Sequence, residues 1–319
     1  MIELAPPLVS VPVLGGDLAV GVWNGADASA PTVLAIHGIT ASHRCWPLVT
    51  AALPGVRVIA PDLRGRGRSN ALGAPYGLAQ HARDMVAMLD YFGVDRVAVL
   101  AHSMGAFVAV TLAAAHPDRV ASLTLVDGGL PLDPPVASAS LTTSDETAVL
   151  GPAAERLSMT FPDQESYRDF WRQHPAFRSD WSETVQGYVD YDLQGVAPVL
   201  RPSGVIEAVS TDVAQLYGGD AYAAALAAVD VPTTFLRAPR GLLDEPQALY
   251  RAERATEHPT IDAMRVVEVA DVNHYTIVLA RSGAETVARE VRRALDADTH
   301  GVERVGADAA EPVSERGIA

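Results

Sequence analysis

Residues 97–114 read VAVLAHSMGAFVAVTLAA, and this stretch guides the interpretation of the whole chain. A strand-like apolar run comes first, a helix-like run of small apolar residues comes last, and Ser103 lies on the turn between them. Ala101 and Gly105 are small enough to let strand and helix approach closely. This is the pattern of a nucleophile elbow, G-x-S-x-G, with alanine as its first small residue, and it holds a serine hydroxyl clear of the backbone. A small-residue turn with a solvated serine is the alternative.

The composition is that of an ordinary globular chain. It has 319 residues, of which 49% are hydrophobic and 20% charged, and its formal net charge is −15 at pH 7. An acidic surface disfavours nucleic acid and anionic membranes as partners. Residues 1–7 lack a basic start followed by a long apolar run, and no stretch of about 18 apolar residues occurs. We therefore expect a cytoplasmic protein that binds neither nucleic acid nor a membrane.

Two residue counts exclude whole classes of chemistry. All 24 basic residues are arginine, so a Schiff-base or general-base mechanism through lysine is excluded. Cys45 is the single cysteine, which rules out an intrachain disulfide, and its position beside Trp46 favours packing over catalysis. The sequence has no metal-ligand spacing, no P-loop and no dinucleotide fingerprint. We expect no metal and no cofactor.

Strand-like apolar runs alternate with helical patterns toward both ends of the chain. We expect a β-hairpin at 8–14 and 18–23, and strands at 32–36, 56–60, 97–101, 122–126, 233–237 and 264–269. We expect helices at 77–91, 106–114, 247–255 and 284–295. This alternation predicts an α/β fold with a mostly parallel, doubly wound sheet.

The pattern changes after the strand that ends near Asp127. From residue 130 to 228, apolar residues recur at helical spacing and no strand run is evident. We expect a helical cap inserted here, at the carboxyl ends of the strands, where open parallel sheets bind ligands. The expected organisation is a core in two parts at 1–129 and 230–297, the cap at 130–229, and a flexible polar tail at 298–319.

A serine hydroxyl needs a base to take its proton, and histidine is the expected base. Among nine histidines, His274 is best placed, because it follows the last predicted strand and precedes the last predicted helix. A histidine in a surface loop is the alternative. An oxyanion needs two backbone N–H donors, which we expect from Met104, directly after the serine, and Ile39, in the loop after the strand at 32–36. We expect His37 to order that loop by hydrogen bonds.

Four short motifs, taken together and in this order, resemble the α/β-hydrolase superfamily with a helical cap. They are His37-Gly38 followed by Trp46, Pro61-Asp62-Leu63-Arg64-Gly65-Arg66-Gly67-Arg68-Ser69, His102-Ser103-Met104-Gly105, and Asn273-His274-Tyr275. The resemblance covers residues 8–297 and is to enzymes of the carboxylesterase and lactonase type. It implies a catalytic order in which the histidine comes last, and it makes residues 62–69 a loop that shapes and braces the site.

The sequence offers two candidates for the acid that orients His274. The resemblance implies an aspartate in the loop after the strand at 233–237, where this chain has Gly241. Asp244, three residues later, is one candidate, and capping of the next helix is its alternative role. Asp127, at the tip of the strand that follows the nucleophile helix, is the other. An acid at that strand end resembles haloalkane dehalogenases and some lactone hydrolases. We favour Asp127, because the two glycines after it let its carboxylate turn inward.

The serine at the elbow sets the expected reaction. The dehalogenases and epoxide hydrolases of this superfamily carry an aspartate there, so serine implies hydrolysis of a carboxylic ester or lactone through an acyl-serine. Carbon–carbon bond hydrolysis, cofactor-free perhydrolysis and a ligand receptor without activity stay open as alternatives. Aromatic residues in the predicted cap suggest a hydrophobic small-molecule substrate, unless they form only the core of the cap. They are Tyr167, Trp171, Trp181, Tyr188 and Tyr191.

Overall fold

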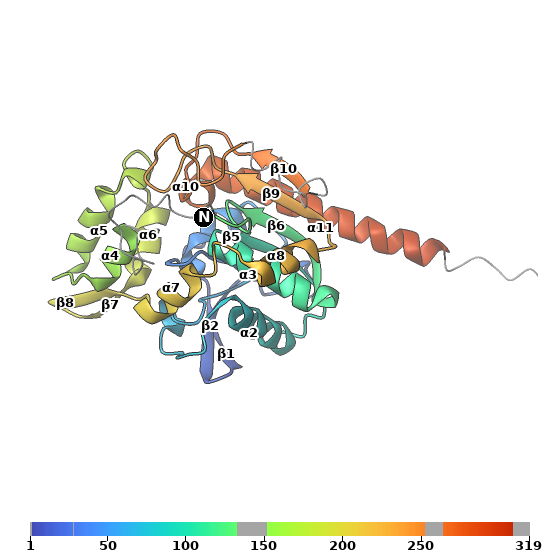
Figure 1. Ribbon diagram of the computed structural model, residues 1–319, viewed down its shortest axis with the longest axis horizontal. Coiled ribbons are helices and arrows are strands. Elements are labelled where there is room, and N and C mark those ends of the chain that lie inside the picture. The colour runs from blue at the N-terminus through green and yellow to red at the C-terminus, as the bar shows by residue number, and fades with distance from the viewer. Residues whose placement is uncertain (1, 28, 133–151, 253–263, 309–319) are drawn as a thin grey trace, which may run out of the picture.

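The structure, a computed structural model, describes residues 2–27, 29–132, 152–252 and 264–308. Its centre is an eight-stranded sheet in the order β1-β2-β4-β3-β5-β6-β9-β10 (Figure 1). The strands are β1 (Leu8–Val13), β2 (Gly16–Trp23), β3 (Thr32–Ile36), β4 (Arg57–Pro61), β5 (Val97–His102), β6 (Val120–Val126), β9 (Thr233–Arg237) and β10 (Met264–Glu268). β1 pairs with β2, and β2 with β4, in antiparallel fashion, and the other neighbours in this sheet are parallel. The predicted mostly parallel α/β sheet is confirmed.

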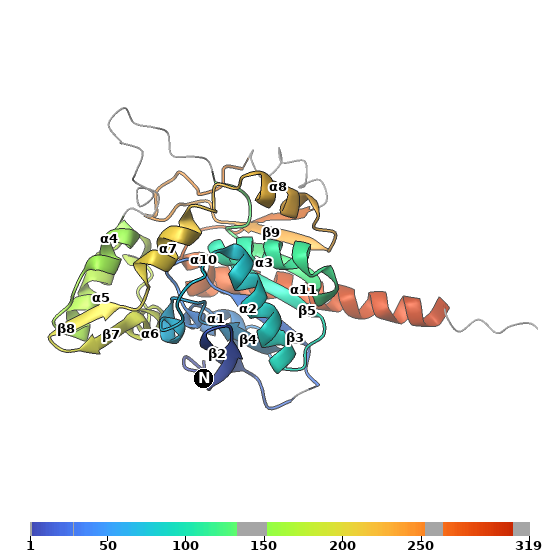
Figure 2. The same cartoon turned by 60° about the horizontal axis from the view of Figure 1, so that its bottom comes forward.

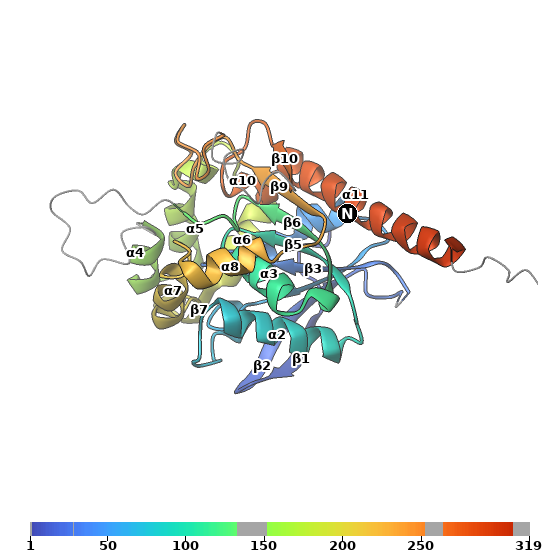
Figure 3. The ribbon, with the colours of Figure 1, turned by 45° about the vertical axis from the view of Figure 1, so that its right-hand side comes forward.

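The sheet is buried on both faces, because alternate residues of its central strands enter two separate cores. In β5, Val99 and Ala101 pack into one core, and Ala98 and Leu100 pack into the other. The first core is covered by α2 (Leu78–Tyr91), α3 (Met104–Ala115) and α8 (Asp220–Ala227), and the second by α1 (Pro47–Ala51), α10 (Thr276–Leu279) and α11 (Arg281–Asp308). Figure 3 shows α2 and α3 on one side of the strands and α11 on the other. Helices on both faces leave the carboxyl ends of the strands to carry a site.

One long insert connects β6 to β9 and forms a layer beside the core (Figures 1 and 2). Before α8 it contains α4 (Pro152–Ser158), α5 (Gln164–Arg172), α6 (Glu183–Asp192), β7 (Leu193–Val196), β8 (Val199–Pro202) and α7 (Ile206–Val213). Short 3-10 turns lie at His43–Cys45, Gly67–Ser69, Pro117–Arg119 and Pro175–Phe177. The insert contacts loops that follow strands of the sheet. The Tyr191 hydroxyl donates to Asp62 after β4 (2.7 Å), and the Asn273 amide after β10 donates to the carbonyl of Ala176 (2.9 Å).

The hairpin β7–β8 corrects the expectation that this segment contains no strand. Its register runs from Leu193 opposite Pro202 to Val196 opposite Val199. Each strand has only four residues, most of them partly or fully exposed, so the alternation of apolar and polar residues that marks a strand cannot build up. Phe161 adds a bridge to Leu200, with backbone hydrogen bonds of 2.8 and 2.9 Å. The hairpin is therefore specified by tertiary pairing more than by local pattern.

Two other segments differ in structure from what the sequence predicted. Residues 247–252 form bends and irregular backbone instead of the start of a helix, and Arg237 Nε donates to the Tyr250 carbonyl (2.5 Å), which ties the segment to the end of β9. Residues 253–255 of that predicted helix lie outside the described residues. The predicted tail at 298–319 is helical as far as Asp308, where α11 ends. This segment continues a helix that begins at Arg281, and extending an existing helix costs less than starting a new one. Within the described residues, no helix is long and apolar enough to cross a bilayer.

Candidate active site

Ser103 occupies a strained turn between β5 and α3. Its backbone has φ +55° and ψ −126°, a conformation that residues with a side chain rarely adopt. Small neighbours make the turn possible: a Cβ on Gly105 would lie 2.3 Å from the Ile36 carbonyl oxygen, and a Cβ on Gly128 would lie 2.1 Å from the carbonyl oxygen of Ser103. The elbow predicted from the sequence thus requires glycine at Gly105 for steric reasons, and Gly128, in the loop after β6, lets that loop pass close to Ser103.

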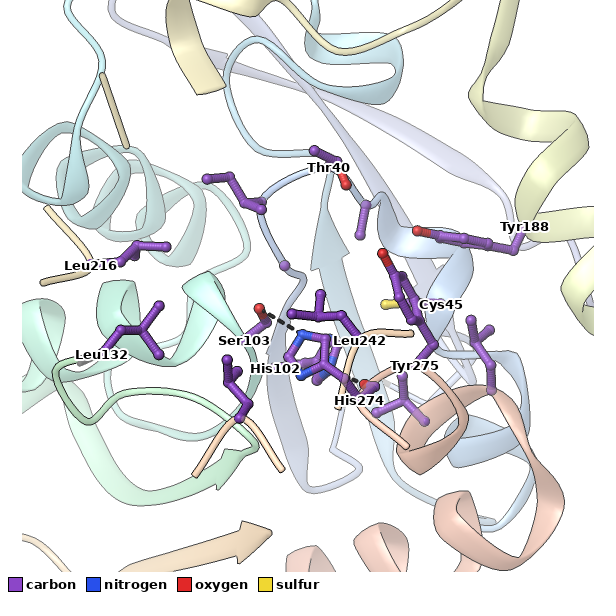
Figure 4. A pocket seen from close by; sticks show the side chains of 16 residues that line it. Thr40, Cys45, His102, Ser103, Leu132, Tyr188, Leu216, Leu242, His274 and Tyr275 are labelled. Carbon is purple, nitrogen blue, oxygen red and sulfur yellow. Dashed lines mark hydrogen bonds between the residues drawn. The ribbon is translucent and has the colours of Figure 1, made fainter. Parts of the chain in front are cut away.

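Three predicted side chains form one hydrogen-bonded chain at the carboxyl ends of β5, β6 and β10. Ser103 Oγ lies 3.0 Å from His274 Nε2, and His274 Nδ1 lies 2.7 Å from Asp127 Oδ2 (Figure 4 shows the first of these contacts). Because Asp127 accepts at Nδ1, the imidazole carries its proton there and presents a lone pair to the serine. The imidazole and the carboxylate are almost fully buried. This arrangement can draw a proton from Ser103 and hold the resulting imidazolium.

The structure separates the two candidate acids. Asp127 points to His274, and its second oxygen accepts from the backbone N–H of Ala238 (3.1 Å). Asp244 instead pairs with Arg240 (2.6 Å) and accepts from the side-chain amide of Asn273 (3.0 Å). Asp244 therefore supports the loop that carries His274 without touching the imidazole.

The loop after β3 brings the other predicted donor to the serine. A Cβ on Gly38 would lie 3.0 Å from Ser103 Cβ and 3.5 Å from its Oγ, so the loop passes directly beside the hydroxyl. In the part of the chain that the structure describes, the backbone N–H groups of Ile39 and Met104 have no protein acceptor. Two free amides next to a serine hydroxyl can receive a negatively charged oxygen.

His37 holds this loop in place, as expected. Its Nδ1–H donates to the carbonyl of Gly38 (2.7 Å), and its Nε2 accepts from the backbone N–H of Leu63 (2.9 Å). Burial lowers the pKa of His37 to about 4, and the neighbouring Asp62 offsets only part of that effect. The ring is therefore neutral at physiological pH, which leaves one nitrogen to donate and the other to accept.

This buried histidine predicts a loss of stability in mild acid. The folded pKa of about 4 lies below the usual histidine pKa of about 6.5, so the stabilisation is complete above pH 6.5 and is lost as the pH falls toward 4. The difference corresponds to about 3 kcal/mol. We expect the free energy of unfolding, from urea titrations between pH 8 and pH 4, to fall through this window and to fall less in the His37→Gln variant. If the free energy of unfolding falls equally with pH in the wild type and in His37→Gln, this role of His37 is contradicted.

Arg66 was not singled out by sequence reasoning, yet it contacts both residues that offer free amides. Its Nε donates to the Ile39 carbonyl (2.9 Å), and its Nη2 lies 3.9 Å from the Met104 sulfur. The same Nη2 lies 2.6 Å from Asp212 of α7, which also accepts from His81 Nε2 (3.0 Å). All these polar side chains are buried. No local signal marks Arg66, because its partners come from distant parts of the chain.

A pocket opens over Ser103 and is mostly apolar. It encloses about 780 Å³ with its mouth included. Figure 4 shows Leu132 and Leu216 on one side of the serine and Cys45, Tyr188 and Tyr275 on the other. It is lined by Gly38, Ile39, Thr40, Ala41, Cys45, His102, Ser103, Leu132, Tyr188, Leu216, Leu242, Leu249, His274, Tyr275, Val278 and Leu279. Burial raises the pKa of the Cys45 thiol, which fits the expected packing role. Within the described residues, no cluster of side chains suits a metal ion.

Comparison with known proteins gives one family and several partial relatives. A protein-family model described as alpha/beta hydrolase fold matches residues 31–279. Lipase LipV of Mycobacterium tuberculosis is 44% identical over 101 residues, which are 32% of this chain and 38% of that protein. Epoxide hydrolase B of the same species is 28% identical over 199 residues, 59% of this chain and 51% of that protein. The chain thus matches less than two thirds of the length of these curated relatives.

Solved structures extend the likeness of fold to almost the whole chain. The thioesterase domain from the curacin biosynthetic pathway superposes with a TM-score of 0.71 at 23% identity. The superposition covers 90% of this chain and 99% of that domain. At this identity the match concerns the fold alone.

Proposed function

The chain belongs to the alpha/beta hydrolase fold family, and from that premise we propose that it is a serine hydrolase of carboxylic esters or lactones. The observation that carries the proposal is the hydrogen-bonded chain Ser103–His274–Asp127, beside two backbone amides with no protein acceptor in the described residues. A serine with a base, an orienting carboxylate and an oxyanion site is the equipment of acyl transfer. The apolar pocket above it supports a hydrophobic substrate, and the insert, whose Tyr188 and Leu216 line that pocket, serves as its cap.

The reaction proceeds in two halves. Ser103 Oγ attacks the ester carbonyl while its proton passes to His274 Nε2, and the resulting oxyanion binds the N–H groups of Ile39 and Met104. The imidazolium, stabilised by Asp127, then gives its proton to the departing alkoxide, which leaves an acyl-serine and an alcohol. Water attacks the acyl-serine with the same histidine as base, and the acid is released as Ser103 regains its proton.

His102 supports the base without adding charge. Its Nε2–H donates to the backbone carbonyl of His274 (2.8 Å), and the two rings lie 4.7 Å apart. Burial, followed by the influence of His274, lowers the pKa of His102 well below its usual range. A neutral ring at this position lets His274 become positive during the reaction without repulsion from a second cation.

A fluorophosphonate probe tests the proposal directly. The probe should form a covalent adduct on Ser103 of the folded protein, because the phosphorus takes the place of the ester carbonyl and fluoride leaves. Intact mass followed by peptide mapping reads the result, with heat-denatured protein and the Ser103→Ala variant as controls. If the folded protein takes no label at Ser103, the proposed hydrolase is rejected and a ligand receptor of this fold is favoured.

The contacts of Arg66 predict a role in holding the oxyanion site. Arg66→Lys keeps a positive charge near Asp212 but loses the planar fork that also reaches the Ile39 carbonyl. We expect kcat for a p-nitrophenyl ester to fall about tenfold with KM changed much less. The reason is that Arg66 holds the residue whose N–H binds the oxyanion, and the oxyanion forms only in the transition state.

Arg64→Lys is the matched control for this variant. Arg64 lies two residues away, is equally buried and makes a two-pronged pair with Asp84 (2.9 Å for each contact). It contacts neither Ile39 nor Met104, so its substitution should lower the melting temperature with kcat nearly retained. Equal losses of kcat in the two variants would assign Arg66 to stability alone.

A further inference from the structure

The cap side of the pocket contains hydroxyl groups that the proposed chemistry does not use. Tyr188 of α6 is 5% exposed and lines the pocket together with Tyr275, which follows the base His274. Figure 4 shows the hydroxyls of Tyr188 and Tyr275 turned toward the same part of the pocket, with the Thr40 hydroxyl nearby. Within the described residues, none of these three hydroxyls has a hydrogen-bond partner in the protein.

Other tyrosines of this chain show what a buried hydroxyl normally does. Tyr222 donates to the carbonyl of Gly129 (2.7 Å), and Tyr250 donates to the carbonyl of Leu130 (2.8 Å). A buried hydroxyl without a partner is costly, and one that faces a pocket can be satisfied by a ligand. The two pocket tyrosines are therefore suited to bind a substrate atom.

The charge around these hydroxyls selects the kind of atom. Burial raises the pKa of Tyr188 and of Tyr275, so both keep their protons and can donate. The described residues that line the pocket include no Arg, Asp or Glu. Arg156, a buried cation whose charge acts on Tyr275, is already paired with Asp192 and Tyr167. A carboxylate bound here would be buried without a free counterion, which is costly. A ketone, ether or hydroxyl oxygen carries no charge and needs no counterion.

We propose that Tyr188 and Tyr275 form a subsite for an uncharged oxygen of the substrate. The preferred substrate then has two unlike ends on either side of the reacting carbonyl. One end is a hydrocarbon that packs against Leu132 and Leu216, and the other carries a ketone, ether or hydroxyl oxygen that the two tyrosines bind. This assignment rests on the proposed ester or lactone hydrolysis and narrows its substrate class.

Matched esters test the subsite. One series compares p-nitrophenyl hexanoate with the p-nitrophenyl esters of keto-hexanoic acids that have the ketone at the fourth or fifth carbon. The second series places the same chains on the alcohol side, as acetates followed by pH-stat. In at least one series, kcat/KM should favour the keto ester by about 10- to 100-fold, since the plain chain leaves the hydroxyls unpaired.

Three variants identify the source of this preference. Tyr188→Phe and Tyr275→Phe each remove one hydroxyl and should each reduce the ratio of kcat/KM values to about threefold or less. Tyr217→Phe is the control, because it also removes a buried hydroxyl that has no partner in the described residues, but outside the pocket lining. It should keep the wild-type ratio. The subsite is rejected if the wild type cleaves the keto and plain esters with nearly equal kcat/KM. It is also rejected if both pocket variants keep the wild-type preference for the keto ester.

Binding to the Ser103→Ala variant separates this inference from the proposed function. Calorimetry with the same esters should show tighter binding of the keto ester, and a second substitution, Tyr188→Phe, should remove the difference. If no ester is cleaved by the wild type but this difference remains, the subsite holds and the hydrolase fails. If esters are cleaved and no difference in binding is found, the hydrolase holds and the subsite fails.

Discussion

Ser103→Ala is expected to reduce kcat for hydrolysis of p-nitrophenyl butanoate by roughly 10⁵-fold or more, to the background of hydroxide and the binding site alone. The substitution removes the only atom that can form the acyl intermediate in the proposed mechanism, since Oγ lies 3.0 Å from the base. Alanine tolerates the φ of +55° no better and no worse than serine, so the melting temperature should stay close to that of the wild type.

The control for this variant is another serine-to-alanine change outside the site. Ser158 lies at the end of α4, where its hydroxyl donates to the Glu155 carbonyl (2.7 Å). Ser158→Ala should retain full activity. Stopped turnover in Ser103→Ala, with the fold verified by circular dichroism, would support the nucleophile assignment. Substantial activity in that variant would show that another group attacks the ester.

Asp127→Asn is expected to lower kcat by about 10³- to 10⁴-fold. The backbone N–H of Ala238 donates to one oxygen of Asp127, so an asparagine would place its carbonyl oxygen there and turn its NH₂ toward His274. The NH₂ would then donate to Nδ1 and move the imidazole proton to Nε2. A protonated Nε2 cannot accept from Ser103, so the base is blocked although nothing has moved.

The paired variant Asp244→Asn should change kcat by less than about tenfold. Asp244 acts on Arg240 and on the Asn273 amide, and both contacts help to shape the loop without reaching the imidazole. Both variants are assayed with the same ester at one pH, and urea titrations separate loss of stability from loss of turnover. A larger loss in Asp244→Asn than in Asp127→Asn would move the acid to the loop after β9.

The sequence predicted those features that a local pattern or a strand end specifies. The elbow is local, because the small residues around Ser103 must lie within a few positions of it. His274 and Asp127 were found because a parallel sheet brings the carboxyl ends of its strands to one edge. The sequence favoured Asp127 over Asp244 because two glycines follow it, and in the structure Asp127 contacts the imidazole whereas Asp244 contacts Asn273 and Arg240.

Long-range contacts account for what the sequence did not predict. The hairpin β7–β8 is joined by a bridge from Phe161 to Leu200, and the loop at residues 247–252 is tied to β9 by Arg237. Arg66 joins Ile39 and Asp212 through its guanidinium, and both partners are distant from it in the chain. None of these partners is near in sequence, so no periodicity or capping pattern marks them.

The position of Asp127, directly after β6, has a consequence for how the pocket can change. With the carboxylate directly after β6, the described part of the loop after β9, residues 238–252, forms no side-chain hydrogen bond with His274 and contributes Leu242 and Leu249 to the pocket wall. Mutations in that loop can reshape the pocket wall while the charges around His274 stay as they are. In the proposed mechanism, substrate range and catalytic power are therefore separable traits, and laboratory evolution toward bulkier or smaller esters should begin at Leu242 and Leu249.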